Sequence, residues 1–273
     1  MKIFITSLFL IFLNGCSQFE IVYRNAETLM EWRVGGYLEQ TVEDEFILQQ
    51  NIHKLLNWHR DIMLPSYSKF LEKQLAIIEK GRIDRAQIFE AIVASKKLLE
   101  ETLKGGSPFV AAVLKRHTSV KKLSYLKLRI KEERDDEQKS FDSENDLTAR
   151  RENKVKSNLR SLMGSTNEVQ MMAVDRYVKA TSKFSQFWIE RREKREKDLI
   201  SFLSQDPTVD EIERFLVTLL IGPEKESMSE AWWVHFSHLL IEVFTSLEQK
   251  QRLKLIVSLH DYIRDMKAIS QNE

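Results

Sequence analysis

The sequence contains few of the residues that build disulfides, turns or strands. Its 273 residues include one cysteine, four prolines and eight glycines. A single cysteine excludes an intramolecular disulfide framework, and the scarcity of proline and glycine favours long helices. No segment alternates valine or threonine with polar residues between turn signals, so no strand is expected. The sequence therefore predicts an all-α protein, a multi-helix bundle of roughly nine to ten helices.

An excess of charge of one sign is also missing, as is a long apolar run. The formal net charge is +1, which gives no support for nucleic-acid binding. The apolar run at residues 3–13 is too short for a bilayer, which a helix crosses with about 20 residues. The sequence has no Gly-x-Ser-x-Gly, no P-loop and no Gly-rich dinucleotide turn. We therefore expect a protein that is not an enzyme, with no catalytic residue and no bound cofactor.

The N-terminus has the pattern of a signal peptide, with Lys2 before the apolar run. The stretch Leu13-Asn14-Gly15-Cys16 that follows resembles the bacterial lipobox. The resemblance implies that residues 1–15 are removed and that Cys16 carries diacylglycerol and an N-acyl chain. Because Ser17 is not an aspartate, similarity to Gram-negative sorting signals implies an anchor on the periplasmic face of the outer membrane. The alternative is an ordinary signal peptide followed by an incidental cysteine.

Helical periodicity and breaker residues divide the rest of the chain. We expect a first helix over 19–34, ended by Gly35-Gly36, which either lies on the membrane or folds back into the core. Further helices are expected from the N-caps Thr41 and Asp84, after Pro65, over 165–204 and over 246–266. Breaks are expected at 81, 105–108, 206–207 and 222–223. Ser165 with Glu168, and Ser246 with Gln249, fit capping boxes.

One stretch, residues 131–158, is rich in charge and poor in apolar side chains. We interpret it as a solvated charged helix or a linker. It suggests two packed helical subdomains, an N-terminal one over 16–130 and a C-terminal one over 159–273.

Several motifs resemble a family of uncharacterised Gram-negative lipoproteins, a domain-of-unknown-function family. They are the lipobox at Cys16, Val22-Tyr23-Arg24-Asn25-Ala26, Trp58-His59-Arg60, Leu64-Pro65-Ser66-Tyr67 and, near the C-terminus, Ser246-Leu247-Glu248-Gln249-Lys250. The resemblance implies an all-helical lipoprotein and brings no catalytic residues. The helix starts at Thr118, Ser165 and Thr245 are more weakly similar to the Leu-Thr-x-x-Gln repeats of periplasmic stress chaperones.

Two groups of side chains are candidates for a site. Trp58, His59 and Tyr67 could line a pocket or a partner surface, although a packed tryptophan with a histidine acceptor is the simpler interpretation. His235, His238 and Glu242 lie at i, i+3 and i+7 on one helix face and could hold zinc, although a packed histidine pair is the simpler interpretation.

The function expected from these features is that of a lipid-anchored envelope protein without enzymatic activity. It would bind another envelope protein or an unfolded client, and no nucleic acid. The alternative is an envelope enzyme or metal-binding protein that uses the His235, His238 and Glu242 face.

Overall fold

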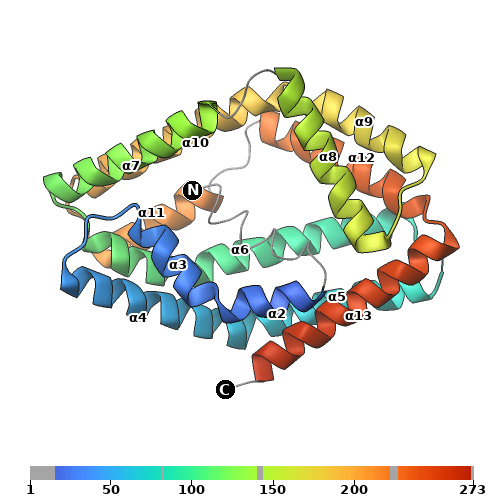
Figure 1. The fold of residues 1–273 in the computed structure, drawn as a ribbon, viewed down its shortest axis with the longest axis horizontal. Helices are drawn as coiled ribbons and strands as arrows, with labels where there is room; N and C mark the ends of the chain where they lie inside the picture. The colour runs from blue at the N-terminus through green and yellow to red at the C-terminus, as the bar shows by residue number, and fades with distance from the viewer. Residues whose placement is uncertain (1–15, 82, 140–143, 222–226, 272–273) are drawn as a thin grey trace.

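The computed structural model describes residues 16–81, 83–139, 144–221 and 227–271, and every element in these ranges is a helix (Figure 1). The predicted all-α class is therefore confirmed. The predicted signal peptide and the Gly222-Pro223 break lie outside the described residues. The elements in chain order are α2 (Cys16–Arg24), α3 (Ala26–Gly35), α4 (Val42–Trp58), the π-helix η2 (His59–Met63), α5 (Leu64–Glu79), α6 (Arg85–Lys115), α7 (Val120–Lys139), α8 (Glu144–Met163), α9 (Glu168–Thr181), α10 (Phe184–Leu203), α11 (Val209–Ile221), α12 (Ser227–Thr245) and α13 (Gln249–Gln271).

The helices are arranged as an elongated frame rather than a parallel bundle (Figure 1). One long side holds α4, α5, α6 and α13, while α7 and α10 lie together on the opposite side, followed by α8, α9 and α12. The 31-residue helix α6 runs along the frame and packs on α4, α11 and α12. The short helices α2 and α3 cross the viewed face.

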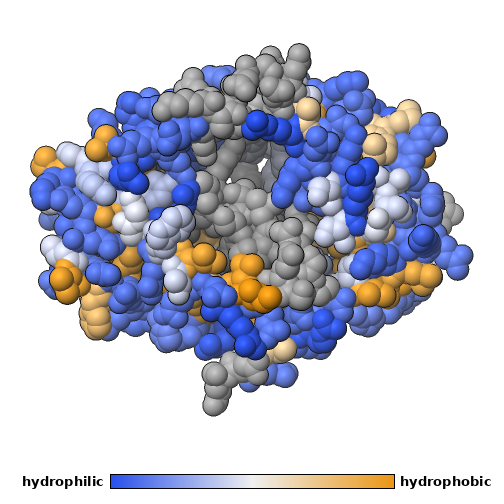
Figure 2. All heavy atoms as spheres, in the orientation of Figure 1, coloured by the Kyte–Doolittle hydropathy of each residue, from blue (hydrophilic) through white to orange (hydrophobic). Residues whose placement is uncertain are grey.

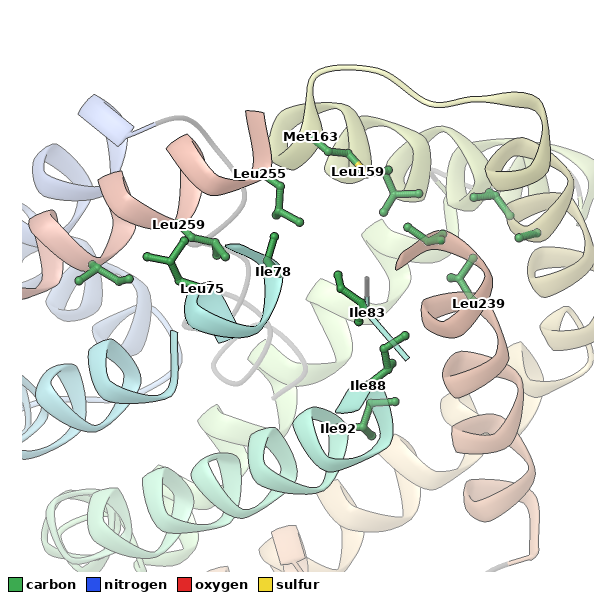
Figure 3. Close-up of a cluster of buried hydrophobic side chains, with 14 of the residues drawn as sticks. Leu75, Ile78, Ile83, Ile88, Ile92, Leu159, Met163, Leu239, Leu255 and Leu259 are labelled. Carbon is green, nitrogen blue, oxygen red and sulfur yellow. The ribbon is translucent and has the colours of Figure 1, made fainter. Parts of the chain in front are cut away.

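The largest hydrophobic cluster joins segments from both ends of the sequence. Side chains from α5, α6, α8, α12 and α13 point into a common space (Figure 3). Leu75 and Ile88 therefore share one core with Leu159 and Leu255, which lie on the far side of the predicted 131–158 linker. Within that segment, Arg134 of α7 pairs with Glu193 and Glu196 of α10. The core thus continues across the proposed boundary.

The first helix is divided where the sequence predicted continuity over 19–34. Asn25 has φ −97° and ψ 4° and separates α2 from α3, and its side-chain amide donates to the carbonyl of Ile21 at 2.7 Å. A short amide side chain that bonds the local backbone competes with helix propagation. The expected end of the helix at Gly35-Gly36 is confirmed.

The break predicted at 105–108 is wrong, because α6 continues through it to Lys115. Proline inside a helix cannot donate to the carbonyl four residues back, which for Pro108 belongs to Lys104. The hydroxyl of Ser107 donates to that carbonyl at 2.7 Å instead. Gly105 has a packing role: a Cβ atom there would overlap the ring of Trp58.

The N-caps predicted at Thr41 and Asp84 are confirmed. Thr41 with Asp44, and Asp84 with Gln87, form capping boxes at α4 and α6. The long helix expected over 165–204 instead starts at Glu168 and divides before Phe184.

The capping boxes predicted from Ser165 and Ser246 are wrong, because α9 and α13 start two or three residues later. Gln170 caps back to Asn167, and Gln251 accepts from the backbone of Glu248. The two glutamines are fully buried and exchange reciprocal amide hydrogen bonds of 2.9 and 3.0 Å. The tertiary pairing of these amides therefore sets the register of both helix starts.

Candidate functional site

The helix from Val42 to Glu79 changes geometry at His59, where one wider turn, η2, joins α4 to α5. The backbone N–H of Leu64 donates to the carbonyl of His59, five residues back. Pro65 lies directly after this turn, in the first turn of α5, and has no N–H to donate to the preceding turn. π-turns are rare in proteins, and those that do occur are often found at functional sites. This turn directs the side chain of His59 inward.

His59 is 4% exposed and lies against α2. Its Nδ1 atom is 3.2 Å from the Tyr23 hydroxyl, which donates to the carbonyl of Leu56 at 3.3 Å. The tyrosine proton is then committed, so Nδ1–H donates to Tyr23 and the Nε2 atom is the free acceptor. Nε2 has no hydrogen-bond partner among the described residues. Burial lowers the pKa of His59 to about 4, so the imidazole is neutral at physiological pH.

Aromatic rings close around this imidazole. Tyr23 stacks on it at 5.9 Å between ring centroids, and Tyr67 meets it edge-on at 5.7 Å. The Tyr67 hydroxyl donates to Thr102, whose hydroxyl donates to the carbonyl of Leu98. Burial raises the pKa of both tyrosines, so they remain neutral phenols. The cluster holds uncharged donors and acceptors in an apolar setting.

The structure brings together the three residues that the sequence analysis grouped. Trp58 packs edge-on against His59 at 6.4 Å, and Tyr67 completes the cluster. His59 and Tyr67 are buried and Trp58 is half-buried, so the group forms part of the interior rather than an open partner surface. Tyr23 and Thr102 were missed. Each is more than 30 residues from its partner in the cluster, and no local signal links them.

A second candidate is an open groove of about 680 Å³ between α3 and α7. Glu133 accepts from both Arg33 and Tyr37, and the Arg33 guanidinium lies 5.4 Å from the Tyr37 ring centroid. Arg129 donates to the carbonyl of Gly36 at 2.9 Å. The groove is lined by Trp32, Arg33, Gly36, Tyr37, Arg129, Glu132, Glu133, Asp135 and Asp136. The charge-rich sequence of this part of α7 predicts a solvated helix or linker, and no local pattern indicates the groove.

Comparison with known families gives one match. Residues 36–231 match the model of a family of unknown function, DUF6279. The chain belongs to this family. No curated protein and no solved structure matches the chain. The uncharacterised family predicted from the sequence is confirmed at this level, whereas the lipid anchor and the chaperone resemblance stay predictions.

The DUF6279 match includes Trp58, His59 and Tyr67 and begins directly after α3. Most of the groove therefore lies in the matched region, while Trp32, Arg33 and the helices α2 and α3 precede it. Cys16 is the first residue of α2, and its side chain lies outside the described part of the structure. Among the described helices, none combines the length and hydropathy that a membrane crossing requires.

The proposed metal face on α12 is engaged in other contacts. His235 packs edge-on against Phe184 at 6.0 Å, His238 is exposed, and Glu242 pairs with Arg176 of α9. In the described ranges, no three histidine, cysteine, aspartate or glutamate side chains are placed to hold a metal ion. The geometry of these three residues therefore favours packing and an interhelical ion pair.

Proposed function

We propose that this DUF6279 protein is a lipoprotein of the outer membrane, held on the periplasmic side by acyl chains on Cys16. Its helical body binds another envelope protein or an unfolded client and catalyses no reaction. The sequence Leu13-Asn14-Gly15-Cys16, the serine at position 17 and the apolar run at 3–13 support the anchor. Two or more acyl chains give stable attachment without a membrane-spanning helix.

The observation that carries the binding role is a set of exposed apolar side chains on α6, α9 and α12. These helices share one core, yet each also presents large apolar side chains to solvent: Phe89, Val93, Val169, Met172 and Val234. Each of the five is at least 50% exposed. We call these residues the α6–α9–α12 surface. Exposed apolar area is stabilised when a partner covers it, and methionine adapts to partners of different shape.

Two side-chain contacts join α6 and α9 to α12. The Lys96 ammonium of α6 lies 3.9 Å from the Trp233 ring centroid of α12, and Arg176 of α9 pairs with Glu242 of α12. These contacts hold the helices in fixed relation, so the surface needs little ordering on binding.

The anchor is tested by labelling cells with radioactive palmitate. The wild-type chain should incorporate label and float with outer-membrane fractions, whereas Cys16→Ala should incorporate none. Equal labelling of both chains would contradict a lipid on Cys16.

Binding is tested by placing a photo-crosslinking amino acid at Met172 or Val234 in living cells. Both positions should give adducts with other envelope proteins. The control positions Val120 and Leu253 are 84% and 57% exposed on other helices and should give few. A discrete adduct indicates one partner and a broad distribution indicates unfolded clients. Equal adduct yields at all four positions would contradict the proposed surface.

A further inference from the structure

The helices α2 and α3, residues 16–35, form a strip that is apolar on two sides; we call it the α2–α3 strip. On its inner side Phe19 is 2% exposed and packs with Tyr262 and Met266 of α13. Met30 and Val34 of α3 pack against Leu38 and its neighbours, but α3 has no fully buried residue. The strip therefore lies on the body without being enclosed by it.

On its outer side the strip presents three large apolar side chains. Trp32 is 73% exposed, Ile21 60% and Leu29 50%. In Figure 2, hydrophobic side chains lie on the viewed face where α2 and α3 cross it in Figure 1. Removing large apolar side chains from water is favourable, in rough proportion to the apolar area removed. This outer side is therefore suited to an apolar environment.

Ion pairs engage charged groups along the strip. Arg24 pairs with Glu20 at 2.6 Å and Arg33 pairs with Glu133, while a Glu27 carboxylate oxygen lies 3.2 Å from His53 Nδ1. Paired charges lower the cost of bringing the strip close to an apolar phase. Tryptophan is enriched where one end of a side chain is apolar and the other is wet, as at a membrane interface.

We propose that the α2–α3 strip lies on the lipid surface beside the anchor, with Ile21, Leu29 and Trp32 in the interfacial layer. This inference rests on the proposed lipid at Cys16. Because α2 begins at Cys16 itself, no linker separates the acyl chains from the helix. A helix rises 1.5 Å per residue, so Trp32 lies within about 24 Å of the anchor. The same lipid that holds Cys16 is therefore within reach of all three side chains.

The groove beside Trp32 indicates which lipid surface fits. Its lining has two arginines, Arg33 and Arg129, against four carboxylates, among them Glu132 and Glu133. An excess of carboxylates disfavours contact with anionic lipids. The strip should therefore associate with zwitterionic phospholipid, and anionic lipid should not strengthen the association.

The test uses the full lipidated protein in phosphatidylcholine vesicles whose acyl chains carry bromine, a contact quencher of tryptophan emission. The chain has five tryptophans, so quenching of Trp32 should lower total emission by roughly one fifth relative to vesicles without bromine. Trp32→Phe should lose this decrease. The control Trp188→Phe, at a half-buried tryptophan of α10, should keep it. Replacing part of the phosphatidylcholine with phosphatidylglycerol should not increase quenching.

The outcomes separate the inference from the proposed anchor. Flotation with the vesicles together with quenching that depends on Trp32 supports the inference. Flotation without such quenching overturns the lipid contact and leaves the anchor intact. A wild-type chain that fails to float removes the anchor, and the inference falls with it.

Discussion

Two regions of the molecule bury a titratable side chain, and they do so in opposite ways. His59 is 4% exposed, has an unpartnered Nε2 atom and is neutral. The Asp44 side chain is fully buried, but it accepts from Thr41, Lys122 and Arg116. Burial removes water from both groups, and the neighbouring hydrogen-bond donors determine whether each group is ionised or neutral.

Asp44 stays charged because three donors converge on it, two of them from distant parts of the chain. Burial alone would raise the pKa of the Asp44 carboxyl, but hydrogen bonds from Lys122, Thr41 and Arg116 hold it well below its usual range. His59 has only the Tyr23 hydroxyl beside Nδ1 and no carboxylate partner, so burial alone lowers its pKa. A buried charge persists where donors converge, and a buried group without them becomes neutral.

The largest effect should come from Asp44→Ala. It leaves the largely buried Lys122 ammonium without its carboxylate and removes the cap of α4, while Arg116 keeps its pair with Glu43. The free energy of unfolding should fall by about 3–5 kcal/mol. Urea denaturation measures this. Glu43→Ala removes a neighbouring carboxylate that also pairs with Arg116 but is 70% exposed, and it should change stability by less than about 1 kcal/mol. Equal effects of the two variants would mean that burial of Asp44 contributes nothing.

As the pH falls, the stability that depends on His59 should be lost before the stability that depends on Asp44. The unfolded imidazole titrates near 6.5 and the folded one near 4, so the unfolded state binds more protons and stability falls as pH drops through this range. Across this pH range, His59 should lower the free energy of unfolding by about 3 kcal/mol in total. Burial also lowers the pKa of His117, which adds a loss in the same direction.

The contribution of His59 is isolated by comparing variants across pH. His59→Phe should flatten the dependence of unfolding free energy on pH between 4 and 6.5. His238→Gln, at an exposed position, should leave the wild-type profile unchanged. A profile of His59→Phe that retains the full acid loss would assign it to other groups.

Gly105→Ala should disturb the His59 region through Trp58. The added methyl group would overlap the indole ring, which also packs against His59 and Phe109, so unfolding free energy should fall by about 1–3 kcal/mol. Gly106→Ala is the matched control, since its Cβ would meet Leu55 Cδ1 at 3.4 Å. It should be neutral or stabilising by up to about 1 kcal/mol, the helix preference of alanine over glycine. Chemical denaturation of both variants decides between tight packing and simple helix propensity.

The smallest expected change in stability comes from Ser107, two residues after Gly105 on α6. Ser107→Ala removes the donor to the carbonyl of Lys104 and should cost about 1 kcal/mol. In a Pro108→Ala background the backbone N–H of residue 108 can donate instead, so the same change should cost less. A double-mutant cycle measures this coupling. Additive costs would show that Ser107 does not substitute for the missing N–H.

Features that depend on a few neighbouring residues were predictable from sequence. The caps at Thr41 and Asp84 each use a side chain and a backbone N–H three residues apart, so the local sequence specifies them. The all-α class follows in the same way from many residues that favour helix. The grouping of Trp58, His59 and Tyr67 was also predictable, since all three lie on one helical stretch.

Only the tertiary structure decided the features in which distant residues meet. Gly105 and Pro108 signal a break locally, yet packing against Trp58 and the Ser107 hydroxyl keep α6 continuous. Tyr23 reaches His59 across 36 residues, and the buried amides of Gln170 and Gln251 fix two helix starts across 81. The sequence alone determines which segments favour helix, because that preference is summed over neighbours. Burial and long-range hydrogen bonds then determine where each helix ends and which side chains meet.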